Sequence, residues 1–157
     1  EAVADRLRLS NREAELFYRL VLYHLRPRHL SREPQLTRRA IFRFFRDLEE
    51  DGPACLLMWW ADRMATRGPA SRLDQVDQQR ARLEELLRAY FDKAEELITP
   101  PRLIDGNQLM SALGIAPGPL VGKLLRGIEE AQAEGQVRSR EDALILARQL
   151  LHQADVR

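Results

Sequence analysis

Apolar residues recur at helical spacing from the start of the chain. The first apolar stripe consists of Leu16, Leu20, Val21 and His24. Ser10 followed by Glu13 three residues later is a capping box, which predicts a helix beginning after Ser10. We expect this helix to end before Pro27, because a residue that precedes proline is disfavoured in the helical region. Residues 27–36 then form a polar loop.

Two further helices are expected in the first half of the chain. The segment 37–49 begins with Thr37 as its cap and buries one apolar face, which consists of Ile41, Phe44, Phe45 and Leu48. The segment 54–66 is apolar nearly all round, which indicates a central core helix. It holds the single cysteine, Cys55, which we expect to be a buried thiol. Gly68 can end this helix with a left-handed turn.

The second half also follows a helical pattern. Residues 72–98 are expected to form one long helix that ends at Pro100-Pro101. Shorter helices follow over 105–113, from the 117–119 turn to 134, and from a cap at Ser139 to 153. No segment has a strand pattern, so the predicted fold is all-α. The expected domains are a helical body (1–70), a connecting helix (71–100) and a helical tail (101–157).

Net charge is only +1, but positive charge is concentrated locally. Seven arginines lie in one stretch: Arg26, Arg28, Arg32, Arg38, Arg39, Arg43 and Arg46. Glu33 is the only acidic residue between the first and last of them. Arginine forms paired hydrogen bonds with phosphate, so this stretch is a candidate nucleic-acid surface. The alternative is a solvated helix face, although such faces normally mix both signs of charge.

The turn from Pro117 to Lys123 is a second candidate site. Free amides and the helix dipole at a helix start favour an anion. Gly118 and Gly122 would let a phosphate approach the backbone, and Lys123 adds charge. The alternative is a simple helix start, in which Gly122 permits close helix packing. Leu124 stands where a P-loop needs Ser or Thr, so a P-loop is excluded.

Metal chemistry has little support in the sequence. The three histidines are His24, His29 and His152, and they are scattered. His24 lies on the apolar stripe, where a core histidine is the ordinary case. Asp62 follows two tryptophans on the apolar helix and is expected to pair with Arg63 or Arg67. We therefore expect neither a metal, nor a cofactor, nor a catalytic residue in this chain.

The chain shows no targeting signal and no apolar run near the roughly 20 residues of a membrane span. With its single cysteine, nothing points to an oxidising compartment, and we expect a cytoplasmic protein with no membrane partner. The sequence starts at Glu1 without an initiator methionine, which suggests an excised fragment.

Two stretches resemble a known family. The tail contains Asp105-Gly106-Asn107-Gln108-Leu109-Met110, then Leu113-Gly114-Ile115-Ala116-Pro117-Gly118-Pro119, and later Arg140-Glu141-Asp142-Ala143-Leu144. This pattern is similar to the C-terminal tail of bacterial CCA-adding enzymes and poly(A) polymerases. Residues 9–68 resemble the preceding region in the subset that carries an HD module, through His24-Leu25-Arg26-Pro27, the arginine-rich run from Leu36 to Asp47, and Ala61-Asp62-Arg63.

The resemblance implies a helical region of a tRNA nucleotidyltransferase that grips the acceptor stem and T-arm of tRNA. It also implies a catalytic head, with a Gly-Ser motif and paired aspartates that hold Mg²⁺, which this chain lacks; the chain alone should be inactive. Asp62 matches the last HD aspartate and His24 a histidine of some HD sites. The alternatives are a fragment of an HD-type metal-dependent phosphohydrolase, or a helical interaction module that forms a homodimer.

Overall fold

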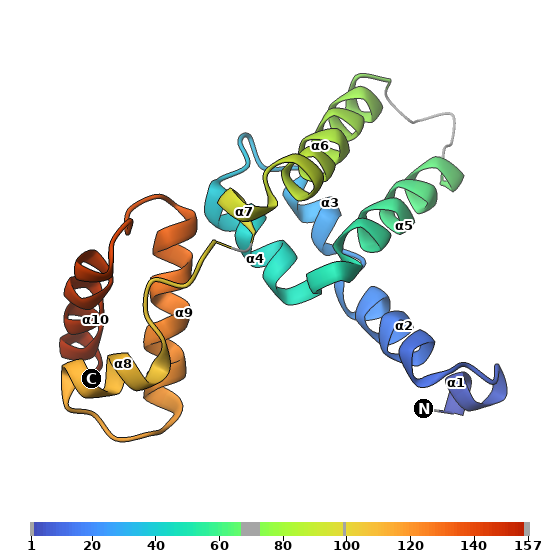
Figure 1. Cartoon of the computed structure of the whole chain (residues 1–157). Coiled ribbons are helices and arrows are strands. Elements are labelled where there is room, and N and C mark those ends of the chain that lie inside the picture. Colours follow the sequence, from blue (N-terminus) through green and yellow to red (C-terminus); the bar gives the residue numbers. More distant parts are fainter. Residues whose placement is uncertain (1, 67–72, 99, 156–157) are drawn as a thin grey trace. The chain divides into compact units, whose positions relative to one another are not determined.

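The computed structural model describes residues 2–66, 73–98 and 100–155, and every regular element in them is helical. The predicted all-α fold is confirmed. The chain forms two compact units, Glu1–Asp92 and Lys93–Arg157, called here the N-terminal and C-terminal units (Figure 1). No helix in the described ranges is long and apolar enough to cross a membrane. The expectations for Arg67 and Gly68 lie outside the described residues.

Local capping signals set the starts of two helices in the N-terminal unit. Its elements are α1 (Ala2–Arg6), α2 (Asn11–Tyr23), α3 (Arg26–Leu30), α4 (Arg38–Leu48), the 3-10 turn η1 (Glu49–Asp51), α5 (Gly52–Ala65) and α6 (Leu73–Asp92). Both halves of the predicted capping box form, since Glu13 N–H donates to Ser10 Oγ and Ser10 N–H to the Glu13 carboxylate. Thr37 Oγ1 accepts from Ala40 N–H at 3.1 Å and caps α4 as predicted.

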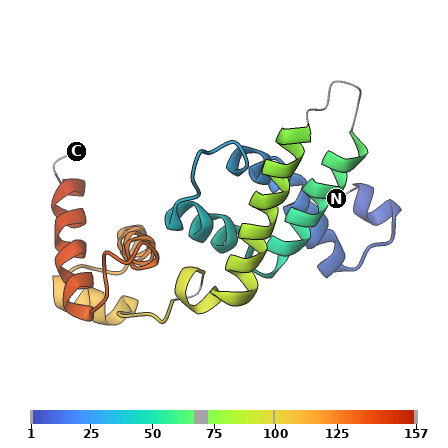
Figure 2. The same cartoon turned by 90° about the horizontal axis from the view of Figure 1, so that it is seen from above.

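Helix α5 is the central element of this unit. It packs against α2, α3, α4 and α6, and Figures 1 and 2 show it beside α6. Its inner face buries Cys55, Leu56 and Trp59, as expected, but its outer face leaves Leu57 55% exposed. The expected apolar face of α4 is fully buried and also includes Phe42. Burial raises the pKa of the Cys55 thiol to about 11.

The α4–α5 junction depends on Gly52. A Cβ at this position would lie 2.5 Å from Cδ1 of Phe45, far inside normal contact distance. The Phe45 ring has no exposed surface and packs edge-on against Phe44, with ring centroids 4.9 Å apart. Its other neighbour is Tyr90 of α6, at 5.2 Å. Only glycine allows the start of α5 to lie this close to the ring.

Two sequence-based expectations for helix positions are wrong. The apolar stripe predicted on α2 is not fully covered, because this helix has no buried residue and Val21 is 56% exposed. Residues 27–30 of the expected loop belong to α3, since proline is tolerated in the first turn of a helix. The long helix expected over 72–98 ends at Asp92 and resumes as α7 (Ala94–Leu97). Nothing in the sequence around Lys93 explains that break.

The segment between α3 and α4 is fastened to α6 by Arg82. The Arg82 guanidinium donates to Glu33 O at 2.8 Å and Pro34 O at 3.3 Å, and to the Glu85 carboxylate at 2.6 Å. Its side chain is only 12% exposed. Because two of its acceptors are backbone carbonyls, Arg82 fixes the course of the chain between the two arginine-bearing helices α3 and α4.

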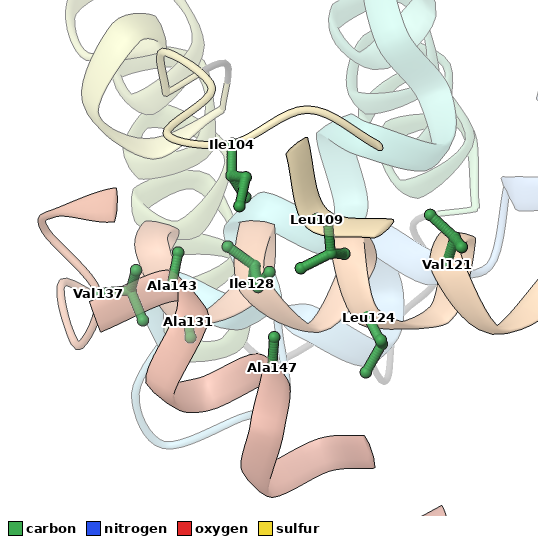
Figure 3. Packing of buried hydrophobic residues seen from close by; sticks show 9 residues of the cluster. All are labelled: Ile104, Leu109, Val121, Leu124, Ile128, Ala131, Val137, Ala143 and Ala147. Carbon is green, nitrogen blue, oxygen red and sulfur yellow. The ribbon is translucent and has the colours of Figure 1, made fainter. Parts of the chain in front are cut away.

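The C-terminal unit includes α7 and packs α8 (Gly106–Leu113), α9 (Pro119–Ala133) and α10 (Arg140–Asp155) into a small helical bundle. Its core side chains project from these three helices, from Ile104 before α8 and from Val137 between α9 and α10 (Figure 3). Gly114 (φ 65°) and Gly135 (φ 78°) follow α8 and α9 with left-handed backbone. Ser139 caps α10, as predicted, by accepting from Asp142 N–H at 3.1 Å.

Candidate nucleic-acid interface

Helix α4 separates its apolar and basic residues onto different sides. Thr37 sets the start of the helix, and the buried face holds it against the core. Arg38, Arg39 and Arg43 are exposed. No acidic residue precedes Asp47 in this helix. The structure therefore brings three of the arginines predicted from sequence onto the exposed side of one helix.

Two other predicted arginines are held within the fold. The Arg26 guanidinium lies 2.8 Å from one oxygen of Asp47, and Arg46 Nε lies 3.0 Å from the other. Each also stacks on a ring, Arg26 over Tyr23 and Arg46 over Phe42. Asp47 thus joins α4 to α3 through Arg26, and it also binds Arg46, its neighbour within α4. A phosphate at either position would compete with this carboxylate.

Arg28, another arginine of the predicted stretch, lines a pocket together with the two HD-like residues His24 and Asp62. The pocket has a volume of about 690 Å³ and is bounded by residues of α2, α3, α5 and α6, His24 and Asp62 among them. His24 is exposed, and its Nδ1 lies 2.6 Å from Val21 O, so the expectation of a core histidine is wrong. Asp62 is also exposed. Its expected neighbour Arg63 pairs through Nε with Gln79 Oε1 at 2.6 Å.

The His24–Asp62 pair does not extend into a metal-binding group. Among the described residues, no three His, Cys, Asp or Glu side chains lie close enough together to hold a metal ion. A hydrolytic metal centre needs a set of such ligands. In this chain the support for an HD-type site is therefore limited to two residues that line one pocket.

The glycine turn before α9 is open. Gly118 is the N-cap with extended backbone (φ 169°), and a Cβ there would meet nothing within 4 Å. Lys123 is exposed. Pro119 has no N–H, and Val121 N–H donates to Gly118 O at 3.1 Å, so the first turn offers fewer amides than expected. Gly122 faces only the end of the Arg126 side chain, so it does not serve close helix packing.

Sequence reasoning missed two features. Arg32 and Arg63 join Arg28 at the pocket, because α3 and α5 pack together. The close-packed glycine of α9 is Gly127, whose added Cβ would lie 2.7 Å from Leu150 Cδ1 of α10. A glycine inside a helix costs about 1 kcal/mol relative to alanine, which was a usable signal for a packing role.

The geometry describes an all-helical protein that presents arginine to solvent on one helix and around one pocket, an arrangement suited to anionic ligands. Comparison of the sequence with known protein families identifies the family of this chain. The chain belongs to the family described as tRNA nucleotidyltransferase domain 2, whose profile matches residues 24–147.

Curated relatives agree with this assignment. The chain is 37% identical over 116 residues to the CC-adding tRNA nucleotidyltransferase of Thermus thermophilus, covering 74% of this chain and 24% of that protein. It is 38% identical over 102 residues to the A-adding tRNA nucleotidyltransferase of Deinococcus radiodurans, covering 64% and 23%. The chain thus spans about a quarter of the length of these relatives. No solved structure gives a significant match.

Proposed function

We propose that this chain is the tRNA-binding region of a nucleotidyltransferase that extends the 3′ end of tRNA, acting in the cytoplasm. The exposed arginines of α4 carry this proposal. Phosphate contacts dominate the affinity of proteins for nucleic acid and position it without reading its sequence. The relatives are named for adding CC or A to tRNA, which supports tRNA as the RNA in this proposal. The Mg²⁺-dependent transfer step is assigned to a head domain outside this sequence.

The α4 surface is tested by the salt dependence of tRNA binding. Arg39→Ala/Arg43→Ala should weaken binding of the full chain to unrelated tRNAs by similar factors. The slope of log K against log salt should become shallower by up to about 2, because each phosphate contact contributes about 0.9. The matched control, Arg80→Ala/Arg88→Ala, removes the same charge from exposed positions of α6. An unchanged slope in the α4 variant, or an equal change in the control, would contradict the proposal.

The turn before α9 is proposed as a second phosphate contact, to the T-arm. Since a side chain at Gly118 meets no protein atom within 4 Å, Gly118→Val should fold normally while blocking close approach of a phosphate. It should weaken tRNA binding more than Lys123→Ala does. Equal binding by Gly118→Val and the unaltered chain, measured alongside thermal melts, would leave the turn a structural feature only.

A further inference from the structure

We infer that the pocket between α2, α3, α5 and α6 binds one nucleoside monophosphate unit, without a metal ion. Among the described residues, three arginines line it: Arg28, Arg32 and Arg63. Asp62 is the one carboxylate that those residues contribute to the lining. The pocket is therefore positive, and its volume of about 690 Å³ falls within the roughly 300–1,000 Å³ typical of small-ligand sites.

The arginines of this pocket differ from others in the N-terminal unit. Arg19, Arg26 and Arg82 each pair with a carboxylate of the fold. Arg28 and Arg32 are exposed, and their side chains form no hydrogen bond or ion pair with the described part of the chain. Arg63 uses its Nε for Gln79, which leaves the outer edge of its guanidinium for a ligand. Two phosphate oxygens match the fork of an arginine, so this group of cations suits a phosphate.

The remainder of the wall suits a flat apolar ring. Val21 and Leu25 line the pocket, and their side chains are 56% and 47% exposed. Together they leave a large apolar surface in contact with water. Met58, which is half-buried, and Trp59, which is only 5% exposed, also line the pocket. A thioether packs well on aromatic rings. A nucleoside monophosphate presents phosphate and planar base together, whereas inorganic phosphate would leave the apolar wall uncovered.

The ligand can be a free nucleotide or a nucleotide turned out of an RNA strand. Equilibrium dialysis of the full chain in EDTA against labelled CMP and AMP should show saturable binding. Cytidine and inorganic phosphate should each bind at least about tenfold more weakly, because each lacks one half of the interaction. If added tRNA displaces the labelled mononucleotide, the natural ligand is a nucleotide of an RNA strand. If tRNA leaves mononucleotide binding unchanged, the natural ligand is a free nucleotide.

Substitutions distinguish this pocket from a general positive surface. Arg28→Ala/Arg32→Ala should weaken mononucleotide binding by about tenfold or more, since charged hydrogen bonds to phosphate are lost. Arg80→Ala/Arg88→Ala, which removes equal charge outside the pocket, should leave it unchanged. Asp62→Asn should preserve or strengthen binding, because it removes the opposing carboxylate. Thermal melts confirm folding of each variant.

The inference is overturned by any of three results. The first is that the unaltered chain shows no saturable mononucleotide binding. The second is that Arg80→Ala/Arg88→Ala weakens this binding as much as Arg28→Ala/Arg32→Ala does. The third is that Asp62→Asn or EDTA abolishes the binding, which would indicate a metal site. The inference does not rest on the α4 surface. If mononucleotide binding fails while Arg39→Ala/Arg43→Ala still alters the salt slope, only the pocket is refuted; the reverse pattern refutes only the proposed function.

Discussion

Gly52→Ala tests the close packing between α4, which carries the exposed arginines, and α5, which carries the pocket wall. The new Cβ would lie 2.5 and 2.7 Å from two atoms of the Phe45 ring. Normal carbon contacts are about 3.5–4.0 Å, so one of the groups must shift by about 1 Å. The ring cannot yield easily, because it is fully buried and contacts Phe44 and Tyr90.

The expected loss is a balance of two terms. Overpacking of a filled core costs about 1–3 kcal/mol, and replacing glycine by alanine in a helix returns at most about 1 kcal/mol. We expect a net loss of about 1–2 kcal/mol in the free energy of unfolding. For a unit of this size, that lowers the melting temperature by roughly 4–16 °C.

Urea unfolding of the full chain, followed by tryptophan fluorescence from Trp59 and Trp60, measures this loss in the N-terminal unit. Gly118→Ala is the control, because its Cβ meets nothing and its backbone is extended. In a Phe45→Leu background the cost of Gly52→Ala should shrink, since the smaller side chain makes room. A Gly52→Ala protein as stable as the unaltered chain would refute the assignment of close packing.

Three further predictions concern other parts of the chain. Because burial raises the pKa of Cys55 from 9.0 to about 11, the unfolded thiol ionises first. Stability should therefore fall as pH rises from about 9 to 11, and Cys55→Ala should lack this decline in alkaline unfolding curves. The Arg138 backbone N–H and the Ser139 hydroxyl lower the pKa of Asp142, so its contribution is present at neutral pH and lost in acid. Ser139→Ala should cost about 1 kcal/mol at neutral pH and flatten that acid loss, as circular dichroism can measure. The exposed apolar face of α2 should promote self-association, and Phe17→Ser should lower the association constant in sedimentation equilibrium; a monomer at every concentration would contradict this.

The sequence was most informative where the determining contacts are local. The caps at Ser10, Thr37 and Ser139 each involve a partner three residues away, and all three form as predicted. The apolar stripe of α2 showed which side is apolar but not whether another element covers it. His24 was therefore expected in a core, although the structure leaves it exposed.

The candidate sites follow the same division. The arginines of α4 belong to one helix, so spacing alone places them together. The pocket joins Arg28 of α3 to Asp62 and Arg63 of α5, and no local pattern predicts that packing. The same reason explains the glycines. Gly122 was predicted to matter because it belongs to the turn from Pro117 to Lys123. The close contact of Gly52 depends on the ring of Phe45, which the local sequence does not reveal.

Arg82 has a consequence for any arginine scan of this protein. Its two backbone acceptors, Glu33 O and Pro34 O, lie in the chain between the pocket arginines Arg28 and Arg32 and the exposed arginines of α4. Replacing Arg82 would release that connection and disturb both groups together. Such a variant would score as the strongest RNA-binding defect of the scan although the residue touches no ligand. Only a measurement that reports the conformation of this segment would show that Arg82 acts by holding the segment in place and not by binding RNA.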